Sequence, residues 1–154
     1  MPAIGDTAPD FTLTAHDKSS VTLSEMRGDR VVLAFFPAAF TGVCTNEMCT
    51  FSDGMTVLGS GGASVLGISV DSPFSNSAFA EANDISFPLL SDVHREAVNA
   101  YDVALGDFVS PGYTVAQRSV FVVEADGSIG YVWVAENPGQ EPDYEAVMAH
   151  CASP

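Results

Sequence analysis

Hydrophobic residues along the chain form short continuous runs that predict buried strands. The run RVVLAFF at 30–36 is rich in β-branched and aromatic residues, and ASVLGISV at 63–70 has the same character. Runs without polar alternation are typical of central parallel strands, which are buried on both faces. Shorter strands are expected at 11–13, 21–23 and 87–90, and a hairpin at 119–124 and 128–135 around Asp126 and Gly127.

Between these strands the hydrophobic spacing changes to that of helices. Steps of three and four residues join Cys44, Met48, Phe51, Met55 and Leu58, which is the period of an amphipathic helix. Gly54 costs such a helix about 1 kcal/mol without cancelling the pattern, and 59–62 is expected to end it. Further helices are expected at 72–83, where Ser72 and Pro73 form a typical start, and at 92–101 and 142–151.

The order of these elements predicts an α/β protein. Parallel strands joined by helices, followed by an antiparallel hairpin and a last helix, describe a central mixed sheet with helices on both faces. This layout is thioredoxin-like, with an N-terminal β extension and a longer stretch at 72–117. The chain of 154 residues has the length of one domain and contains no repeat or linker, so a single domain over 1–154 is expected.

The charge composition excludes several functions. Twenty acidic residues oppose five basic ones, giving a net charge of −15, whereas binding to nucleic acid or to anionic membranes needs clustered Lys and Arg. No apolar run reaches the roughly 18 residues of a membrane span, and the N-terminus resembles no secretion signal, so a cytoplasmic protein is expected. The acid excess favours a halophilic protein, since salt screens self-repulsion; a merely acidic mesophilic protein is the alternative.

The strongest chemical indication lies in the segment FFPAAFTGVCTNEMCTF at 35–51. Cys44 follows a buried strand and a polar loop, so it is expected in the first helical turn, where unpaired N–H groups and the helix dipole favour a thiolate. The dipole contributes only about 0.3–1 kcal/mol, and the acidic composition opposes ionisation. A reactive thiolate therefore needs a nearby cation. Arg118 is the best candidate, because its strand is expected in the centre of the sheet; Arg27, Arg30 and Arg95 are expected to be solvated.

Pro37, Thr41 and Cys44 have the spacing PxxxTxxC, which resembles the signature of the peroxiredoxins. The segments GDTAPDFTL, VLGISVDSP and QRSVFVVEADGSI resemble other landmarks of that family in the same order, so the resemblance covers nearly the whole chain. PAAFTGVC is similar to the E-type alkyl hydroperoxide reductase subfamily, and the spacing in CTNEMC is similar to the bacterioferritin-comigratory or Q-type subfamily. Both subfamilies stay open.

The resemblance implies a thiol peroxidase that reduces hydrogen peroxide and organic hydroperoxides without a cofactor or metal. Cys44 would attack the peroxide and become a sulfenic acid, while Arg118 would stabilise the thiolate and the developing charge. Thr41 would hold the peroxide oxygens, and Pro37 would shield the sulfur from water. Glu47 would orient the arginine; a simple first-turn carboxylate, favoured by the helix dipole, is the alternative.

Cys49 is expected, on the same resemblance, to resolve the sulfenic acid as a disulfide that a thioredoxin- or glutaredoxin-type reductant recycles. Residues five apart in a helix are separated by about 7.5 Å along its axis, and disulfides need Cα atoms within about 7 Å, so the helix would have to unwind. An inert core thiol is the alternative for Cys49. Cys151 is expected to be free, with a resolving or intermolecular role as the alternative. Both a monomer and a homodimer agree with the resemblance.

Other functions fit the sequence less well. Cys44 and Cys49, together with His16, His94 and His150, lack the spacing of a zinc site. The C-x-x-C motif of thiol–disulfide oxidoreductases is absent. A redox-sensing or chaperone-like thioredoxin-fold protein, which passes oxidation to a client, is the remaining alternative; peroxide turnover beyond stoichiometry would distinguish the peroxidase from it.

Overall fold

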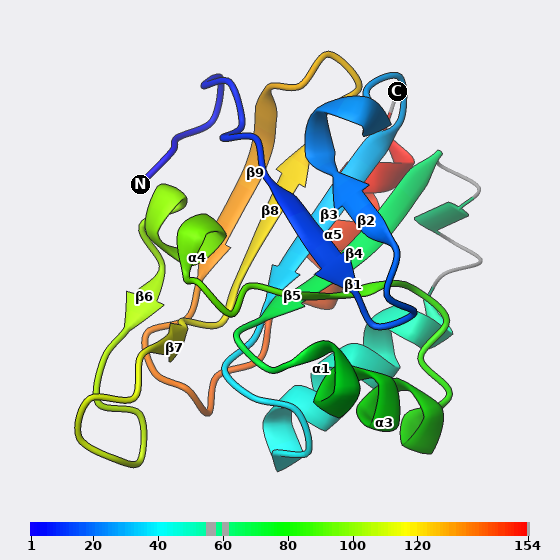
Figure 1. The fold of residues 1–154 in the computed structure, drawn as a ribbon. Coiled ribbons are helices and arrows are strands. Elements are labelled where there is room, and N and C mark those ends of the chain that lie inside the picture. The colour runs from blue at the N-terminus through cyan, green and yellow to red at the C-terminus, as the bar shows by residue number, and fades with distance from the viewer. Residues whose placement is uncertain (55–57, 60–61, 154) are drawn as a thin grey trace.

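The computed structural model describes residues 1–54, 58–59 and 62–153, and its centre is a seven-stranded mixed sheet (Figure 1). The strand order is β2-β1-β5-β4-β3-β8-β9, in which β3, β4 and β5 run parallel and the other pairings are antiparallel. The bounds are β1 Thr12–Ala15, β2 Ser20–Thr22, β3 Arg30–Phe35, β4 Ala63–Ser69, β5 Leu89–Ser91, β8 Ser119–Val123 and β9 Ile129–Val134. The predicted mixed α/β sheet, its N-terminal β extension and its terminal hairpin are confirmed.

Helices cover both faces of this sheet, with α4 in front and α5 behind in the view of Figure 1. Successive residues of β3 alternate between two hydrophobic clusters, as the period of a strand requires. One cluster includes side chains of α4, and the other includes side chains of α1, α3 and α5. The bounds are η1 (a 3₁₀ helix) Leu23–Met26, α1 Gly42–Asp53, α3 Pro73–Asn83, α4 Glu96–Ala100 and α5 Tyr144–Ala152.

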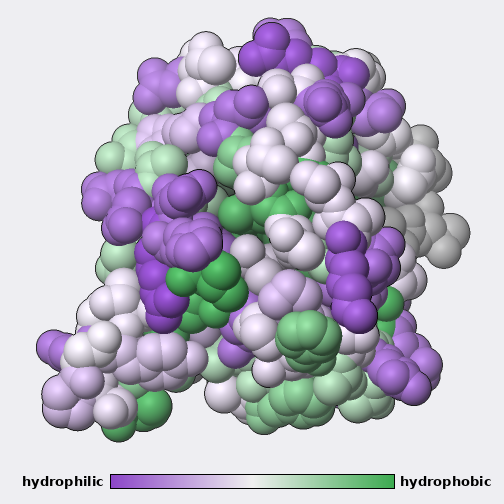
Figure 2. Space-filling view, viewed as in Figure 1, coloured by the Kyte–Doolittle hydropathy of each residue, from purple (hydrophilic) through white to green (hydrophobic). Residues whose placement is uncertain are grey.

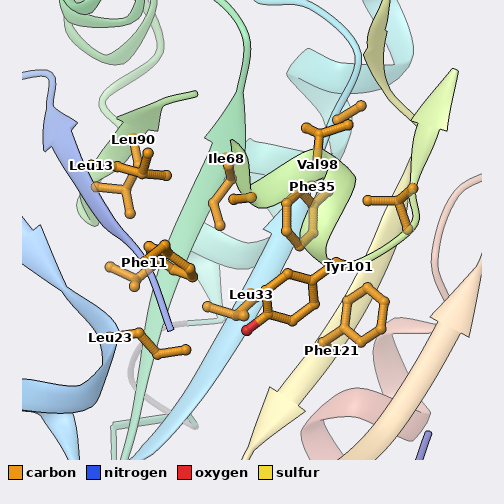
Figure 3. Close-up of a cluster of buried hydrophobic side chains, with 14 of the residues drawn as sticks. Phe11, Leu13, Leu23, Leu33, Phe35, Ile68, Leu90, Val98, Tyr101 and Phe121 are labelled. Carbon is orange, nitrogen blue, oxygen red and sulfur yellow. The ribbon is translucent and has the colours of Figure 1, made fainter. Parts of the chain in front are cut away.

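Strand β3 is buried from Val31 to Phe35, as its uninterrupted hydrophobic run predicts. It pairs with β4 on one side and with β8 on the other. Phe35, Tyr101 and Phe121 pack their rings against one another with centroids 5.1–5.9 Å apart, which joins β3, β8 and the end of α4 (Figure 3). Phe35 is paired with Ser119, so the chain leaving β3 and the chain entering β8 lie at the same edge of the sheet.

Two local predictions are wrong, and two strands were missed. Helix α1 ends at Asp53 with Gly54 as its C-cap, since glycine weakens a helix; Met55 and residues 60–61 lie outside the described residues. The helix expected at 92–101 begins only at Glu96, because the buried Asp92 carboxylate accepts backbone N–H groups at the helix start. Two strands were not predicted: β6 (Ala104–Leu105) and β7 (Val115–Ala116).

The surface agrees with the acidic composition. Hydrophilic side chains spread over the face seen in Figure 2, and hydrophobic side chains are confined to separate small patches. Within residues 1–54, 58–59 and 62–153, no helix has the length and apolar character needed to cross a membrane.

Candidate active site

Cys44 lies in the first turn of α1, as its sequence position predicts. Thr41 is the N-cap of the helix, in an extended conformation, and Cys44 is the third residue that follows. Only 1% of the Cys44 side chain is exposed. The first backbone N–H groups of a helix have no partner within the helix and carry the positive end of its dipole. The sulfur is therefore held in a dry position beside groups that favour a negative charge.

The side chain of Arg118 reaches this sulfur from the entrance of β8. Its Nη2 donates a hydrogen bond to Cys44 Sγ at 3.2 Å and a second one to the carbonyl of Pro138 at 3.0 Å. The guanidinium is 2% exposed. Burial opposes its charge, but Glu47 and Cys44 outweigh burial and raise the pKa of Arg118. The site thus contains a permanent positive charge at hydrogen-bond distance from the thiol.

Glu47 is completely buried beside the same guanidinium. Its Oε1 accepts a hydrogen bond from Arg118 Nη1 at 2.8 Å, whereas Oε2 has no hydrogen-bond partner among the described residues. Burial raises the pKa of Glu47 to about 8, although the charge and hydrogen bond of Arg118 act in the opposite direction. The alternative of a first-turn carboxylate favoured by the helix dipole is wrong, because the first turn of α1 contains no acidic residue and Glu47 contacts the arginine inside the protein.

The loop between β3 and α1 carries Pro37 and Thr41, seven and three residues before Cys44. Thr41 Oγ1 donates to the carbonyl of Ala38 at 2.8 Å and makes no capping hydrogen bond. Its hydroxyl proton is thus engaged, and its lone pairs remain able to accept a hydrogen bond. Pro37 is buried and carries no N–H group. Phe40 adopts a positive φ of 65° in this loop and packs edge-on against Phe79.

Two contributors to the site were not identified from the sequence. Asp71 Oδ2 accepts the backbone N–H of Ala39 at 2.8 Å, which ties the Pro37–Thr41 loop to the end of β4. The Pro138 carbonyl, in the segment before α5, is the second acceptor for Arg118. Asp71 directly follows a parallel strand beside β3, and this position was a usable signal because the carboxyl ends of parallel strands meet at one edge. The role of a backbone carbonyl such as that of Pro138 cannot be predicted from the residue type.

The other two cysteines have different surroundings. Cys49 is half-buried on α1, and burial, followed by the nearby carboxylates of Asp53 and Asp84, raises its pKa. Cys151 is buried on α5, and burial raises its pKa to about 11. All three cysteines are free thiols in this structure. Cys44 and Cys49 lie on the same continuous helix, so this is the conformation of the reduced protein.

The remaining arginines are engaged elsewhere, and the expectation that they are solvated is wrong for two of them. Arg30 pairs with Glu124 at 2.7 Å and donates to carbonyls at the end of α5. Arg95 donates to the carbonyls of Val93 and Thr114. No cluster of three potential metal-ligating side chains occurs in the part of the chain that the structure describes.

Known proteins are similar to this chain in both sequence and fold. The AhpC/TSA family matches residues 4–132. A Mycobacterium tuberculosis protein that bears a peroxiredoxin name is 43% identical over 127 residues, covering 81% of this chain and 80% of the relative. Peroxiredoxin Bcp of Escherichia coli is 38% identical over 130 residues, covering 84% and 83%. The crystal structure of peroxidoxin BcpB from Mycobacterium tuberculosis superposes with a TM-score of 0.87 at 31% identity, covering 98% and 97% of the two chains.

Proposed function

Because the chain belongs to the AhpC/TSA family and is a peroxiredoxin of the Bcp and peroxiredoxin Q type, we propose that Cys44 is the nucleophile of this thiol peroxidase. The observation that carries the proposal is the hydrogen bond between Arg118 Nη2 and Cys44 Sγ. A guanidinium at this distance favours the thiolate, which is the reactive form of a cysteine. Both groups are buried, so bulk water does not screen the interaction.

The proposed reaction starts with attack of the Cys44 thiolate on one oxygen of the peroxide. A sulfur–oxygen bond forms, the oxygen–oxygen bond breaks, and the second oxygen leaves as hydroxide or alkoxide and takes up a proton. Cys44 is oxidised to a sulfenic acid, and the peroxide is reduced to water or an alcohol. Hydrogen peroxide and organic hydroperoxides both fit this chemistry. Arg118 stabilises the charge that moves from sulfur to oxygen, as preorganised donors do in other enzymes.

Thr41 and the helix N-terminus orient the peroxide in this proposal. The Thr41 hydroxyl donates to Ala38, so it accepts the O–H of the peroxide through a free lone pair. The unpaired N–H groups of the first helical turn donate to the peroxide oxygens. Pro37 is buried and has no N–H group, and in this proposal it shields the sulfur from water. Glu47 holds the guanidinium in position through its contact with Nη1.

Cys49 then resolves the sulfenic acid in the proposed cycle. Its thiolate attacks Cys44 sulfur, the sulfur–sulfur bond forms as the sulfur–oxygen bond breaks, and the oxygen leaves as hydroxide, which takes up a proton to become water. The two cysteines are five residues apart in α1, so the first turns of this helix have to unwind. Thr, Gly and Asn at 41–48 are weak helix formers, which favours unwinding there. Ser52 is hydrogen-bonded to Ser86 and to the carbonyl of Asp84, which supports the retention of the last turn.

The proposed cycle ends with the reduction of the disulfide. A thioredoxin- or glutaredoxin-type dithiol reduces the Cys44–Cys49 disulfide and returns both thiols. We place this cycle in a reducing cytoplasm, where thiols are kept reduced. Both a monomer and a homodimer are compatible with a site whose residues all come from one chain.

The direct test compares peroxide consumption by the parent protein, Cys44→Ser and Cys49→Ser in the presence of a thioredoxin-type reductant. Cys44→Ser is expected to abolish consumption, because the nucleophile is lost. Cys49→Ser is expected to consume one equivalent rapidly and then stop, and its mass to increase by one oxygen. Turnover by Cys44→Ser above about one-tenth of the parent rate would refute the assignment of Cys44 as the nucleophile. Unchanged recycling in Cys49→Ser would refute the resolving role of Cys49.

A further inference from the structure

Arg118 is one positive charge shared by two acids. Its Nη1 donates to Glu47 Oε1 at 2.8 Å and its Nη2 donates to Cys44 Sγ at 3.2 Å. Glu47 and Cys44 lie three residues apart in α1, and both are buried, with exposed fractions of 0% and 1%. If both acids ionise, the buried group carries a net negative charge inside a protein that is already strongly anionic. A buried charge without a counter-charge is costly.

We propose that Glu47 and Cys44 compete for the charge of Arg118, so that the protonation of Glu47 sets the fraction of Cys44 present as thiolate. This proposal rests on the function proposed above and concerns the charge of Glu47, beyond its role in positioning the arginine. Two arrangements of the site are neutral: Glu47 carboxylate with Cys44 thiol, and Glu47 carboxylic acid with Cys44 thiolate. One proton moves from sulfur to the carboxylate between them, and no electron is transferred.

The hydrogen bonds at Glu47 favour the protonated carboxyl group. Ion pairs between arginine and carboxylate are strongest when two parallel hydrogen bonds form. Here only Oε1 is engaged, while Glu47 Oε2 and Arg118 Nε have no partner among the described residues. A buried carboxylate oxygen without a donor destabilises the ionised form.

The groups that surround Glu47 act in the same direction. Glu141, in the segment before α5, repels a negative charge on Glu47, and the hydroxyl of Tyr144 on α5 is already committed to Glu141 Oε1 at 2.7 Å. Arg118 is the cation that opposes them. Burial is the largest influence and raises the pKa of Glu47 to about 8. Two buried acids that share one cation titrate as a coupled pair.

The test measures alkylation of Cys44 by iodoacetamide as a function of pH, in a Cys49→Ser, Cys151→Ala background where one thiol remains. Glu47→Gln keeps an acceptor for Arg118 but removes the competing charge. The pH midpoint of alkylation is expected to fall by about one unit. Glu25→Gln, which removes an exposed charge on η1, is the matched control and is expected to leave the midpoint unchanged.

A role of Glu47 in positioning alone predicts the opposite sign, because a less firmly held guanidinium stabilises the thiolate less well. An unchanged or higher midpoint in Glu47→Gln would therefore overturn the proposal. The Cys49→Ser, Cys151→Ala protein, which retains Glu47, provides a second measurement that does not depend on the folding of Glu47→Gln. Its alkylation rate plotted against pH is expected to rise in two steps, and a single step would contradict the competition. Alkylation needs no peroxide, so a protein that shows the shift but consumes no peroxide would refute the proposed function instead.

Discussion

Arg118 Nη2 and Cys44 Sγ lie 3.2 Å apart although 74 residues separate them in the chain. The sheet produces this contact, because β3 and β8 are neighbours and Phe35 is paired with Ser119. The chain that leaves β3 leads to the helix that carries Cys44, and Arg118 directly precedes β8. The strand pairing of the fold thus brings a positive charge to the thiol of Cys44.

The first prediction concerns the loop anchor at Asp71. Asp71→Ala removes the acceptor for the Ala39 N–H, so the loop that carries Thr41 is held less firmly, and kcat/KM for peroxide is expected to fall about tenfold. Asp71→Asn keeps a side-chain oxygen at the same place and is expected to retain most of the activity. Steady-state kinetics on the two variants check this, and equal losses in both, or in neither, would contradict the anchoring role.

The second prediction concerns the pH dependence of disulfide formation. The pKa of Cys49 is raised by burial and by the carboxylates of Asp53 and Asp84, so little of this thiol is ionised at neutral pH. Disulfide formation after a peroxide pulse is expected to accelerate as the pH rises from about 7 to 9, because the thiolate is the attacking form. Asp53→Asn removes one repelling charge and is expected to increase the rate at pH 7 about twofold.

Rapid quenching with an alkylating agent, followed by mass measurement, gives this rate directly. Glu25→Gln again serves as the control, since it changes the net charge equally at a distant site. A rate that is independent of pH, or the same rate in Asp53→Asn and in the control, would show that another step limits the formation of the disulfide.

The third prediction concerns Cys151. Its thiol is 1% exposed on α5, and burial raises its pKa to about 11, so it stays protonated and is not accessible to oxidants. Cys151→Ala is expected to keep peroxide turnover within about twofold of the parent and to give the same disulfide mass after peroxide treatment. A loss of recycling in this variant would assign Cys151 a role in the cycle.

The fourth prediction concerns stability. The pKa of Glu47 is raised from 4.5 to about 8 in the folded protein, so the protonated acid is the form that the fold favours. Its contribution to stability is complete below pH 4.5 and is lost as the pH rises through 8. Glu47→Gln stays neutral at every pH, so its stability relative to the parent is expected to increase by about 1–3 kcal/mol between pH 5 and pH 8.5.

Urea unfolding of the two proteins at both pH values measures this difference, and the comparison cancels the contributions of all other titrating groups. A difference in the free energy of unfolding that stays constant with pH would show that Glu47 is ionised throughout this range in the folded protein.

The sequence predicts those parts of the fold that depend on burial and local chemistry. The run at 30–36 identified β3, Ser72 and Pro73 identified the start of α3, and Asp126 with Gly127 identified the hairpin. The end of α1 was not predicted, because the cost of Gly54 was taken as too small to interrupt the hydrophobic pattern. Strands β6 and β7 were missed because two residues carry no periodicity.

In the candidate site, too, some residues were predictable from the sequence and others were not. Local spacing was sufficient to place Cys44 and Thr41 at the start of a helix. The expected strand order was sufficient to predict that Arg118 lies beside Cys44. The burial of Glu47 and the contacts of Asp71 and Pro138 depend on segments that meet only in three dimensions. The roles of these side chains, the single domain over 1–154 and the halophilic character inferred from the net charge stay predictions.

The most direct test of the account is the reactivity of Cys44 with and without Arg118. Arg118→Ala is combined with Glu47→Gln, so that no unpaired carboxylate is left buried, and is compared with Glu47→Gln alone. Loss of the guanidinium is expected to raise the pH midpoint of Cys44 alkylation by about one unit or more and to lower the rate constant with peroxide about 100-fold. The same midpoint and the same rate constant in both proteins would contradict the claim that Arg118 holds this sulfur ionised.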